Sequence, residues 1–195
     1  MFGLAKKIYD WASRKANSRF APLWLGLVFF LELIFLLPMD AILLLFCLEN
    51  PKRRYTYALM ATLASIGSAV VGYFVGLAAW DIVSPYVLDH LISTAFFERI
   101  HGHYVDFQHW AVFLGSFLPV PFKAVTLTAG VCKLPLLPFI IAVGLARFAR
   151  FFLIAKVVQR WGVQIKTFVD KHFHRFVYAV GAKIALALGF LWALS

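Results

Sequence analysis

The chain has 195 residues, of which 63% are hydrophobic, 17% aromatic and 14% charged, and its formal net charge is +10. Soluble domains are about half apolar and about one quarter charged, so this composition excludes an ordinary water-soluble domain and indicates an integral membrane protein. The excess of Lys and Arg, without an extended basic face, points to anionic lipid rather than nucleic acid as the charged partner.

Residues 1–20 are predicted to form an amphipathic helix that lies along the membrane surface. Leu4, Ile8 and Trp11 recur at helical spacing on one face, and five basic residues lie on the others. A cleaved signal peptide is the alternative. The following apolar run is too long for one and lacks a small-x-small cleavage site, so we expect the segment to remain in the mature chain.

Five apolar runs follow, and each is long enough to reach deep into a bilayer. The first is interrupted by Pro38-Met39-Asp40 and the third by Pro119-Val120-Pro121. Such breaks are tolerated in hydrocarbon only where protein buries the backbone or where it lines a cavity. We therefore predict an all-α integral membrane protein, a single domain, in which the first and third runs are re-entrant helical hairpins and the others cross the membrane. The runs are 21–48, 55–80, 107–132, 135–158 and 176–194.

The distribution of Lys and Arg favours hairpins that enter from opposite faces. Basic residues gather in 1–20, 52–54 and 156–175, whereas 81–106 holds four acidic residues and one arginine. If both interrupted runs turn back, every basic cluster and the N-terminus lie in the cytoplasm, as the positive-inside rule requires. If all five runs crossed fully, Lys52, Arg53 and Arg54 would lie outside. Two proline-kinked spanning helices are the alternative to hairpins.

Residues 85–105 are predicted to form an external interfacial helix, because their apolar side chains share one face. Glu98, His101 and His103 lie on its polar side but do not complete a metal-ligand set. We therefore expect no metal and no other cofactor.

Small residues recur every four positions within 55–80, at Ala64, Ser68, Gly72 and Gly76. Such a stripe lets a neighbouring helix approach closely, most simply within the chain, with a homodimer as the alternative. The two cysteines, Cys47 and Cys132, have neither metal-site nor disulfide spacing and are interpreted as packing or lipid-facing residues.

Five ionisable residues lie inside the apolar runs, where each costs about 2.5 to 3.5 kcal/mol at the bilayer centre. They are therefore expected to converge. Three cations against two acids leave one positive charge, which suits a phosphate that arginine can bind through two parallel hydrogen bonds. The alternative is that the five only neutralise one another. They are Glu32, Asp40, Lys123, Arg147 and Arg150.

The second hairpin supplies further candidates for the phosphate site. Pro119 and Pro121 form its break, and Pro121 begins a limb whose free N–H groups and helix dipole would lie beside Lys123. Glu32 and Asp40 would balance the charge. Glu32 is the better candidate for exchanging protons, whereas Asp40 could instead cap the helix that follows it. Proton coupling is left open.

Several short motifs resemble those of the DedA family, the VTT or SNARE-associated domain. They are the residues from Phe117 to Lys123 and the later Ala129-Gly130, Leu134-Pro135, Pro138-Phe139 and Arg150-Phe151. Members of this family are multi-pass proteins of the bacterial inner membrane, and the YqaA-like branch is the most similar. The resemblance covers about residues 25 to 160 and implies two opposed re-entrant hairpins and a flippase or scramblase for polyprenyl phosphate or phospholipids. By motif, Glu32 or Asp40 matches the acidic positions and Lys123 lies close to an arginine of the second hairpin. Ser116 stands where typical members carry another arginine, for which Arg147 and Arg150 are the substitutes.

The favoured hypothesis is thus a transporter that moves a phosphate-bearing lipid between leaflets, because paired interrupted segments are typical of transporter sites. A proton-coupled carrier of a small ion or solute, supporting envelope homeostasis, is the alternative. The chain has no His-Glu-x-x-His, Gly-x-Ser-x-Gly or Walker motif, so we do not expect an enzyme.

Overall fold

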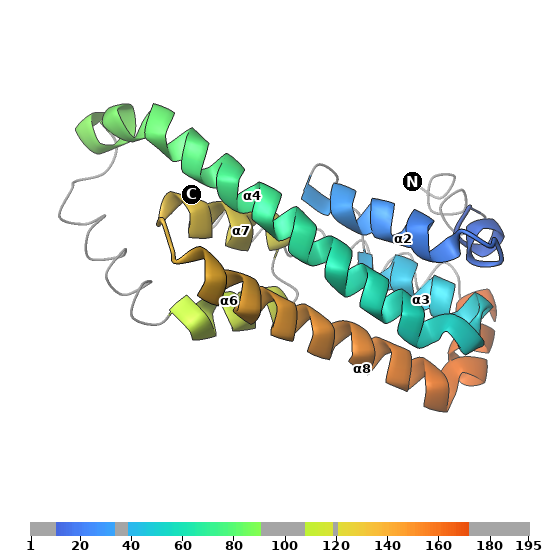
Figure 1. Cartoon of the computed structure of the whole chain (residues 1–195). Coiled ribbons are helices and arrows are strands. Elements are labelled where there is room, and N and C mark those ends of the chain that lie inside the picture. Colours follow the sequence, from blue (N-terminus) through green and yellow to red (C-terminus); the bar gives the residue numbers. More distant parts are fainter. Residues whose placement is uncertain (1–10, 34–38, 91–107, 119–120, 172–195) are drawn as a thin grey trace. The chain divides into compact units, whose positions relative to one another are not determined.

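The computed structural model describes residues 11–33, 39–90, 108–118 and 121–171. The regular elements within these ranges are all helices, which confirms the predicted all-α class (Figure 1). In chain order they are α2 (Ala21–Phe30), η1 (Leu31–Leu33), α3 (Met39–Glu49), η2 (Pro51–Arg53), α4 (Arg54–His90), α6 (Gln108–Phe117), α7 (Phe122–Val131) and α8 (Leu136–Lys171).

Among the described residues, two helices are long and apolar enough to cross a membrane. These stretches are Pro51–Trp80, which is mostly α4, and Leu136–Thr167 of α8. They overlap two predicted spans, 55–80 and 135–158, and the second stretch continues beyond residue 158. Helix α4 continues to His90, so the start of the predicted interfacial segment 85–105 belongs to α4. The third predicted span, 176–194, lies outside the described residues, as do residues 1–10 and 91–107.

Each interrupted apolar run contains two short helices that contact each other. Helices α2 and α3 make up the first pair, and α6 and α7 the second (Figure 1). Proline has no N–H to donate to a helix and fixes its own φ, so it favours helix starts and breaks over helix interiors. Pro121 accordingly precedes α7 as its N-cap residue, with φ −58° and ψ 115°. Pro38 and Pro119 lie in the undescribed breaks.

The described residues form two compact units, and both α4 and α8 contribute to each. Unit 1 comprises Met1–Ser65 and Phe148–Ser195, and unit 2 is the continuous stretch Ile66–Arg147. Aromatic side chains fill the core of unit 1. The rings of Phe29 and Phe151 meet edge to face at 5.1 Å, and those of Phe46 and Tyr57 at 5.6 Å.

Unit 1 also holds the described part of the N-terminal segment, whose residues 11–16 are helical. Ala12 and Ala16 are fully buried, and the Trp11 ring lies 6.1 Å from that of Phe46. The buried Tyr57 hydroxyl donates a hydrogen bond to the Ala16 carbonyl, 2.9 Å away. This segment therefore packs on α3 and α4.

In unit 2, α4 and α7 approach so closely that their backbones touch. A Cβ added at Gly76 would overlap the Leu127 carbonyl, and one added at Gly130 would overlap the Tyr73 carbonyl. Gly76, a member of the stripe of small residues, thus allows close packing between two helices of the same chain. Tyr73 strengthens the same region, because its hydroxyl donates to the Leu134 carbonyl at 2.7 Å.

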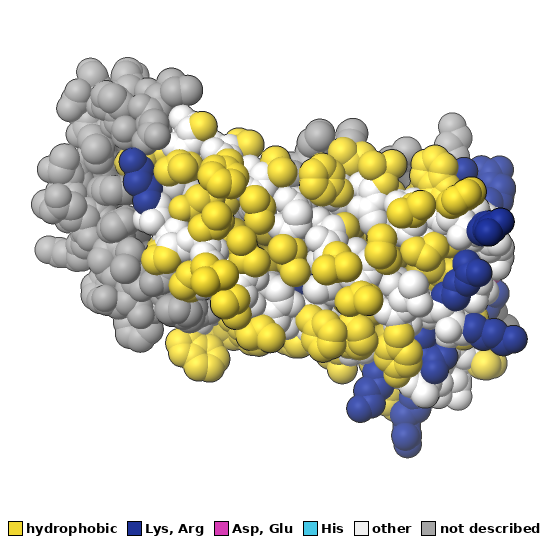
Figure 2. Space-filling model, in the orientation of Figure 1, with side chains coloured by type: hydrophobic (Ala, Val, Ile, Leu, Met, Phe, Trp, Pro, Cys, Tyr) yellow, Lys and Arg dark blue, Asp and Glu magenta, His cyan; other side chains and the backbone are white. Residues whose placement is uncertain are grey.

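The surface and the interior have the character expected of a protein in lipid. Large apolar side chains are exposed along α2, α4 and α8, and Figure 2 shows them spread over the visible face. Small hydroxyl residues are buried inside, among them Thr62, Ser65, Ser68 and Thr126. An exposed apolar surface of this extent marks contact with a membrane or a partner protein.

Candidate functional site

An ion pair between Asp40 and Arg150 lies in unit 1. Asp40 is the second residue of α3, and its Oδ1 accepts a hydrogen bond from Arg150 Nε at 3.1 Å. Arg150 Nη2 pairs with the other oxygen, Oδ2, so the contact is bidentate. The side chains are only 15% and 26% exposed, for Arg150 and Asp40 respectively. Two parallel charge-assisted bonds fix the relative position of α3 and α8 within this unit.

Arg147 precedes Arg150 by almost one turn of α8 and is buried in unit 2, with 3% exposure. Its guanidinium carbon lies 3.6 Å above the centre of the Phe122 ring. Arginine stacks well on an aromatic face because its charge is delocalised over a plane. A buried guanidinium in an apolar helix is costly in a membrane, so such residues usually face the protein interior or a water-filled cavity.

The start of α7 brings three candidate features together in unit 2. Pro121 caps the helix, Phe122 packs under Arg147, and the half-buried Lys123 follows in the first turn. The N–H groups of a first helical turn have no partner within the helix and carry the positive end of its dipole. Cationic side chains and backbone donors thus share one region that favours an anion.

Two of the five predicted charges form an ion pair within unit 1. Asp40 and Arg150 are paired in unit 1, whereas Arg147 and Lys123 belong to unit 2. Glu32 lies in η1 of unit 1, just before the undescribed residues 34–38, and is partly buried. The carboxylate of Asp40 binds Arg150, so its role goes beyond the helix cap considered from the sequence. Pro119 lies outside the described residues.

Sequence reasoning missed Phe122 and the buried hydroxyls. Phe122 is one of many apolar residues in the sequence, and only its contact with Arg147 distinguishes it. Ser68 and Ser116, both in unit 2, have buried hydroxyls without a hydrogen-bond partner among the described residues.

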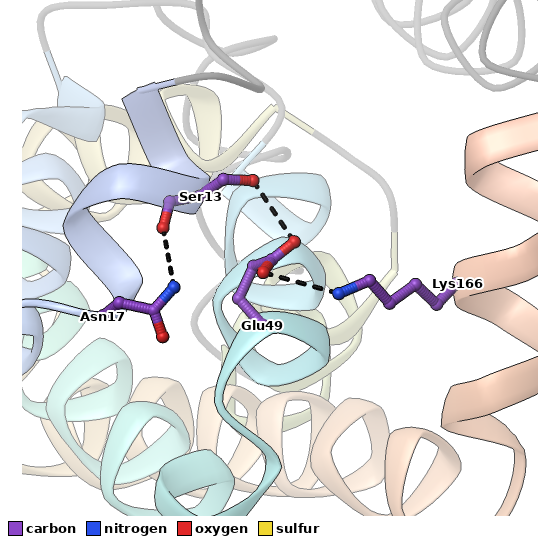
Figure 3. A network of polar contacts seen from close by, with 4 residues as sticks. All are labelled: Ser13, Asn17, Glu49 and Lys166. Atoms are coloured by element: carbon purple, nitrogen blue, oxygen red, sulfur yellow. Dashed lines mark hydrogen bonds and ion pairs between the residues drawn. The ribbon is translucent and has the colours of Figure 1, made fainter.

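Glu49, at the end of α3, is the centre of a second polar network in unit 1, shown in Figure 3. Its Oε1 accepts a hydrogen bond from Ser13 Oγ at 3.2 Å, and its Oε2 lies 3.5 Å from Lys166 Nζ. The Asn17 side chain donates to the Ser13 carbonyl at 3.2 Å. One carboxylate therefore links the N-terminal segment, α3 and α8.

Among the described residues, no three His, Cys, Asp or Glu side chains lie close enough to hold a metal ion. The histidines considered from the sequence, His101, His103, His172 and His174, lie outside the described ranges. Cys47 and Cys132 are both buried.

Comparison with known proteins identifies one family. The VTT domain matches residues 38–160. An uncharacterized protein of Haemophilus influenzae is 33% identical over 159 residues, which is 80% of either chain. A homologue from Histophilus somni is 33% identical over 148 residues, covering 75% of this chain and 77% of its own. No solved structure matches significantly.

Proposed function

The chain belongs to the VTT-domain (DedA) family of membrane proteins, and from that premise we propose that it moves a phosphate-bearing lipid, such as polyprenyl phosphate or a phospholipid, between the two leaflets of the bacterial inner membrane. The observation that carries this proposal is Arg147. It is a buried guanidinium in a helix of membrane-spanning length, held over Phe122 at the start of α7.

The chemistry around Arg147 suits a lipid phosphate. The guanidinium offers parallel donors that match phosphate oxygens, Lys123 adds a mobile charge, and the first turn of α7 adds backbone donors. Arg150, on the same side of α8, is already engaged by Asp40. We assign phosphate binding first to Arg147 and Lys123, because both side chains lie at the start of α7 beside its backbone donors, and we assign Asp40 to charge balance.

Transport is tested by leaflet exchange in liposomes. Purified protein is expected to accelerate the movement of labelled phospholipid or polyprenyl phosphate, and Arg147→Ala is expected to slow it by about tenfold or more, since a charge-assisted hydrogen bond contributes about 1.5 to 3 kcal/mol. Lys156→Ala is the matched control, because it removes an exposed cation from the same helix.

Three results would contradict the proposal: no acceleration by the wild-type protein, unchanged exchange in Arg147→Ala, or equal slowing in Lys156→Ala. Proton movement without lipid exchange would favour the alternative, a proton-coupled carrier of a small solute. A pH-sensitive dye inside the same liposomes measures it.

We further propose that the two short-helix pairs are re-entrant and that the N-terminus is cytoplasmic. The start of α4 lies beside the later part of α8, because Tyr55 donates to Gln159 Oε1 at 2.6 Å and stacks on Phe152. The basic residues 52–54 and Arg160 therefore lie at the same end of unit 1. This arrangement supports a common cytoplasmic position for them.

Cysteine labelling tests this topology. A membrane-impermeant thiol reagent is expected to label Lys133→Cys, between α7 and α8, in intact cells, but to label Lys52→Cys only after permeabilisation. Both positions are exposed and both native cysteines are buried, so the background should be low. Labelling of Lys52→Cys from outside intact cells would overturn the topology.

A further inference from the structure

A cavity of about 370 Å³ lies in unit 1, where α8 departs from helical geometry. The departure is at Trp161, with φ −125° and ψ 18°, and Gly162 follows it. A Cβ at Gly162 would be 3.4 Å from Val158 and 3.9 Å from Leu48, so a small addition fits there. The break and the missing side chain together leave room beside α8.

The lining combines two chemistries. Leu48 and Val158 provide apolar surface, whereas Arg160, Lys166, Gln159 and Gln164 provide cationic and amide groups. An inorganic ion would need only the second set. A phospholipid needs both, because its phosphate and its acyl chains are joined through glycerol.

The surroundings are strongly basic. Pro51 lines the same cavity and is followed by Lys52, Arg53 and Arg54. Figure 2 shows Lys and Arg side chains gathered where α8 ends. Lys166 pairs with Glu49 at 3.5 Å yet remains 45% exposed, so its ammonium keeps access to solvent and to a further acceptor.

Apolar side chains are exposed at the same level of α8. Trp161 is 48% and Val163 80% exposed. Tryptophan is enriched where the headgroups meet the hydrocarbon, and juxtamembrane Lys and Arg attract anionic lipid. The cavity thus has the features of a headgroup site at the membrane surface.

We propose that this cavity binds the phosphate of an anionic phospholipid that stays bound to the protein. The lipid is distinct from the one moved at Arg147. Arg160 binds the phosphate, and the side-chain amides of Gln159 and Gln164 form hydrogen bonds with the glycerol and headgroup hydroxyls. Leu48 and Val158 contact the start of the acyl chains. The proposal requires a membrane location but does not depend on transport.

Native mass spectrometry of the full chain in detergent, with added phosphatidylglycerol or phosphatidylcholine, tests the site. Phosphatidylglycerol is expected to bind at least about tenfold more tightly, and Arg160→Gln to weaken that binding by about tenfold, as loss of one charge-assisted contact predicts. Lys156→Gln, which removes an equal charge outside the cavity, is expected to leave binding unchanged. A melting curve establishes that each variant is folded.

A second variant separates shape from charge. Gly162→Leu places a bulky apolar side chain in part of the cavity without altering the charge, and it is expected to weaken phosphatidylglycerol binding as Arg160→Gln does. Equal binding of both lipids, equal losses in Lys156→Gln and Arg160→Gln, or full binding by Gly162→Leu would each overturn the proposal. Displacement by millimolar inorganic phosphate would identify an ion site and overturn the lipid assignment. Leaflet exchange by Arg160→Gln should match wild type, which keeps this test apart from that of transport.

Discussion

Replacing Arg150 with methionine is expected to lower the free energy of unfolding by about 3 kcal/mol, the low end of the range for breaking a buried ion pair, because both side chains keep some exposure. The loss comes from Asp40, whose carboxylate would remain in the apolar interior of unit 1 without the guanidinium that now binds both of its oxygens. Asp40→Leu should have a similar effect for the reciprocal reason. Unfolding in detergent by a denaturant titration measures both.

The double variant Asp40→Leu with Arg150→Met distinguishes this explanation from a general packing defect. Replacing both partners with apolar residues removes the stranded charge, so most of the lost stability should return. If the double variant is as unstable as the sum of the two single variants, the pair is not the source of the effect. Arg147 is untouched in all three, so lipid exchange by the double variant separates its role from that of Arg150.

Gly130→Ala is expected to destabilise the protein by about 3 kcal/mol, at the upper end of the usual cost of overpacking. The added methyl would overlap the Tyr73 carbonyl and lie 2.7 Å from the Leu77 nitrogen. These are backbone atoms, so no side-chain rotation can relieve the overlap, and α4 and α7 must move apart. Thermal unfolding of the purified variant measures the effect.

Gly26→Ala is the matched control. It also lies in a helix, but its added methyl would meet the end of the Met60 side chain at 3.4 Å, an ordinary contact with a flexible group. Alanine is favoured over glycine in a helix by about 1 kcal/mol, so this variant should be as stable as wild type or more so. Equal losses at positions 26 and 130 would show that the close approach of α4 and α7 is not responsible.

Much of the architecture could be predicted because it depends on local composition. Prolines within apolar runs mark the breaks between short helices, and uninterrupted apolar stretches mark α4 and α8. Because charged side chains are costly in lipid, Asp40 and Arg150 could be chosen as candidates from the sequence. They are 110 residues apart in sequence and form an ion pair. These inferences required only the assumption that a lipid bilayer surrounds the chain.

Other features depend on contacts between distant residues and carry no local signal. Phe122 looked like one apolar residue among many until α8 brought Arg147 over its ring. Gly130 is part of the motif that resembles the DedA family. The reason for a glycine there is the contact between the backbones of α7 and α4, which the motif does not reveal. The backbone of α8 departs from helical geometry at Trp161. No proline lies there, and the sequence is compatible with an uninterrupted helix.

The Glu49 network has a consequence for the order of assembly during synthesis. Glu49 and Lys166 are 117 residues apart, so the contact must wait until most of the chain has left the ribosome. Unit 2 is a single continuous segment and can complete its contacts first. Unit 1 combines residues before Ile66 with residues after Arg147, so it can form only once the later part of α8 has been made. Long loops close at an entropic cost and close late. The first helices to enter the bilayer are therefore the last to gain their final neighbours. A nascent chain stopped before α8 would lack Arg150, which pairs with Asp40, and Lys166, which pairs with Glu49.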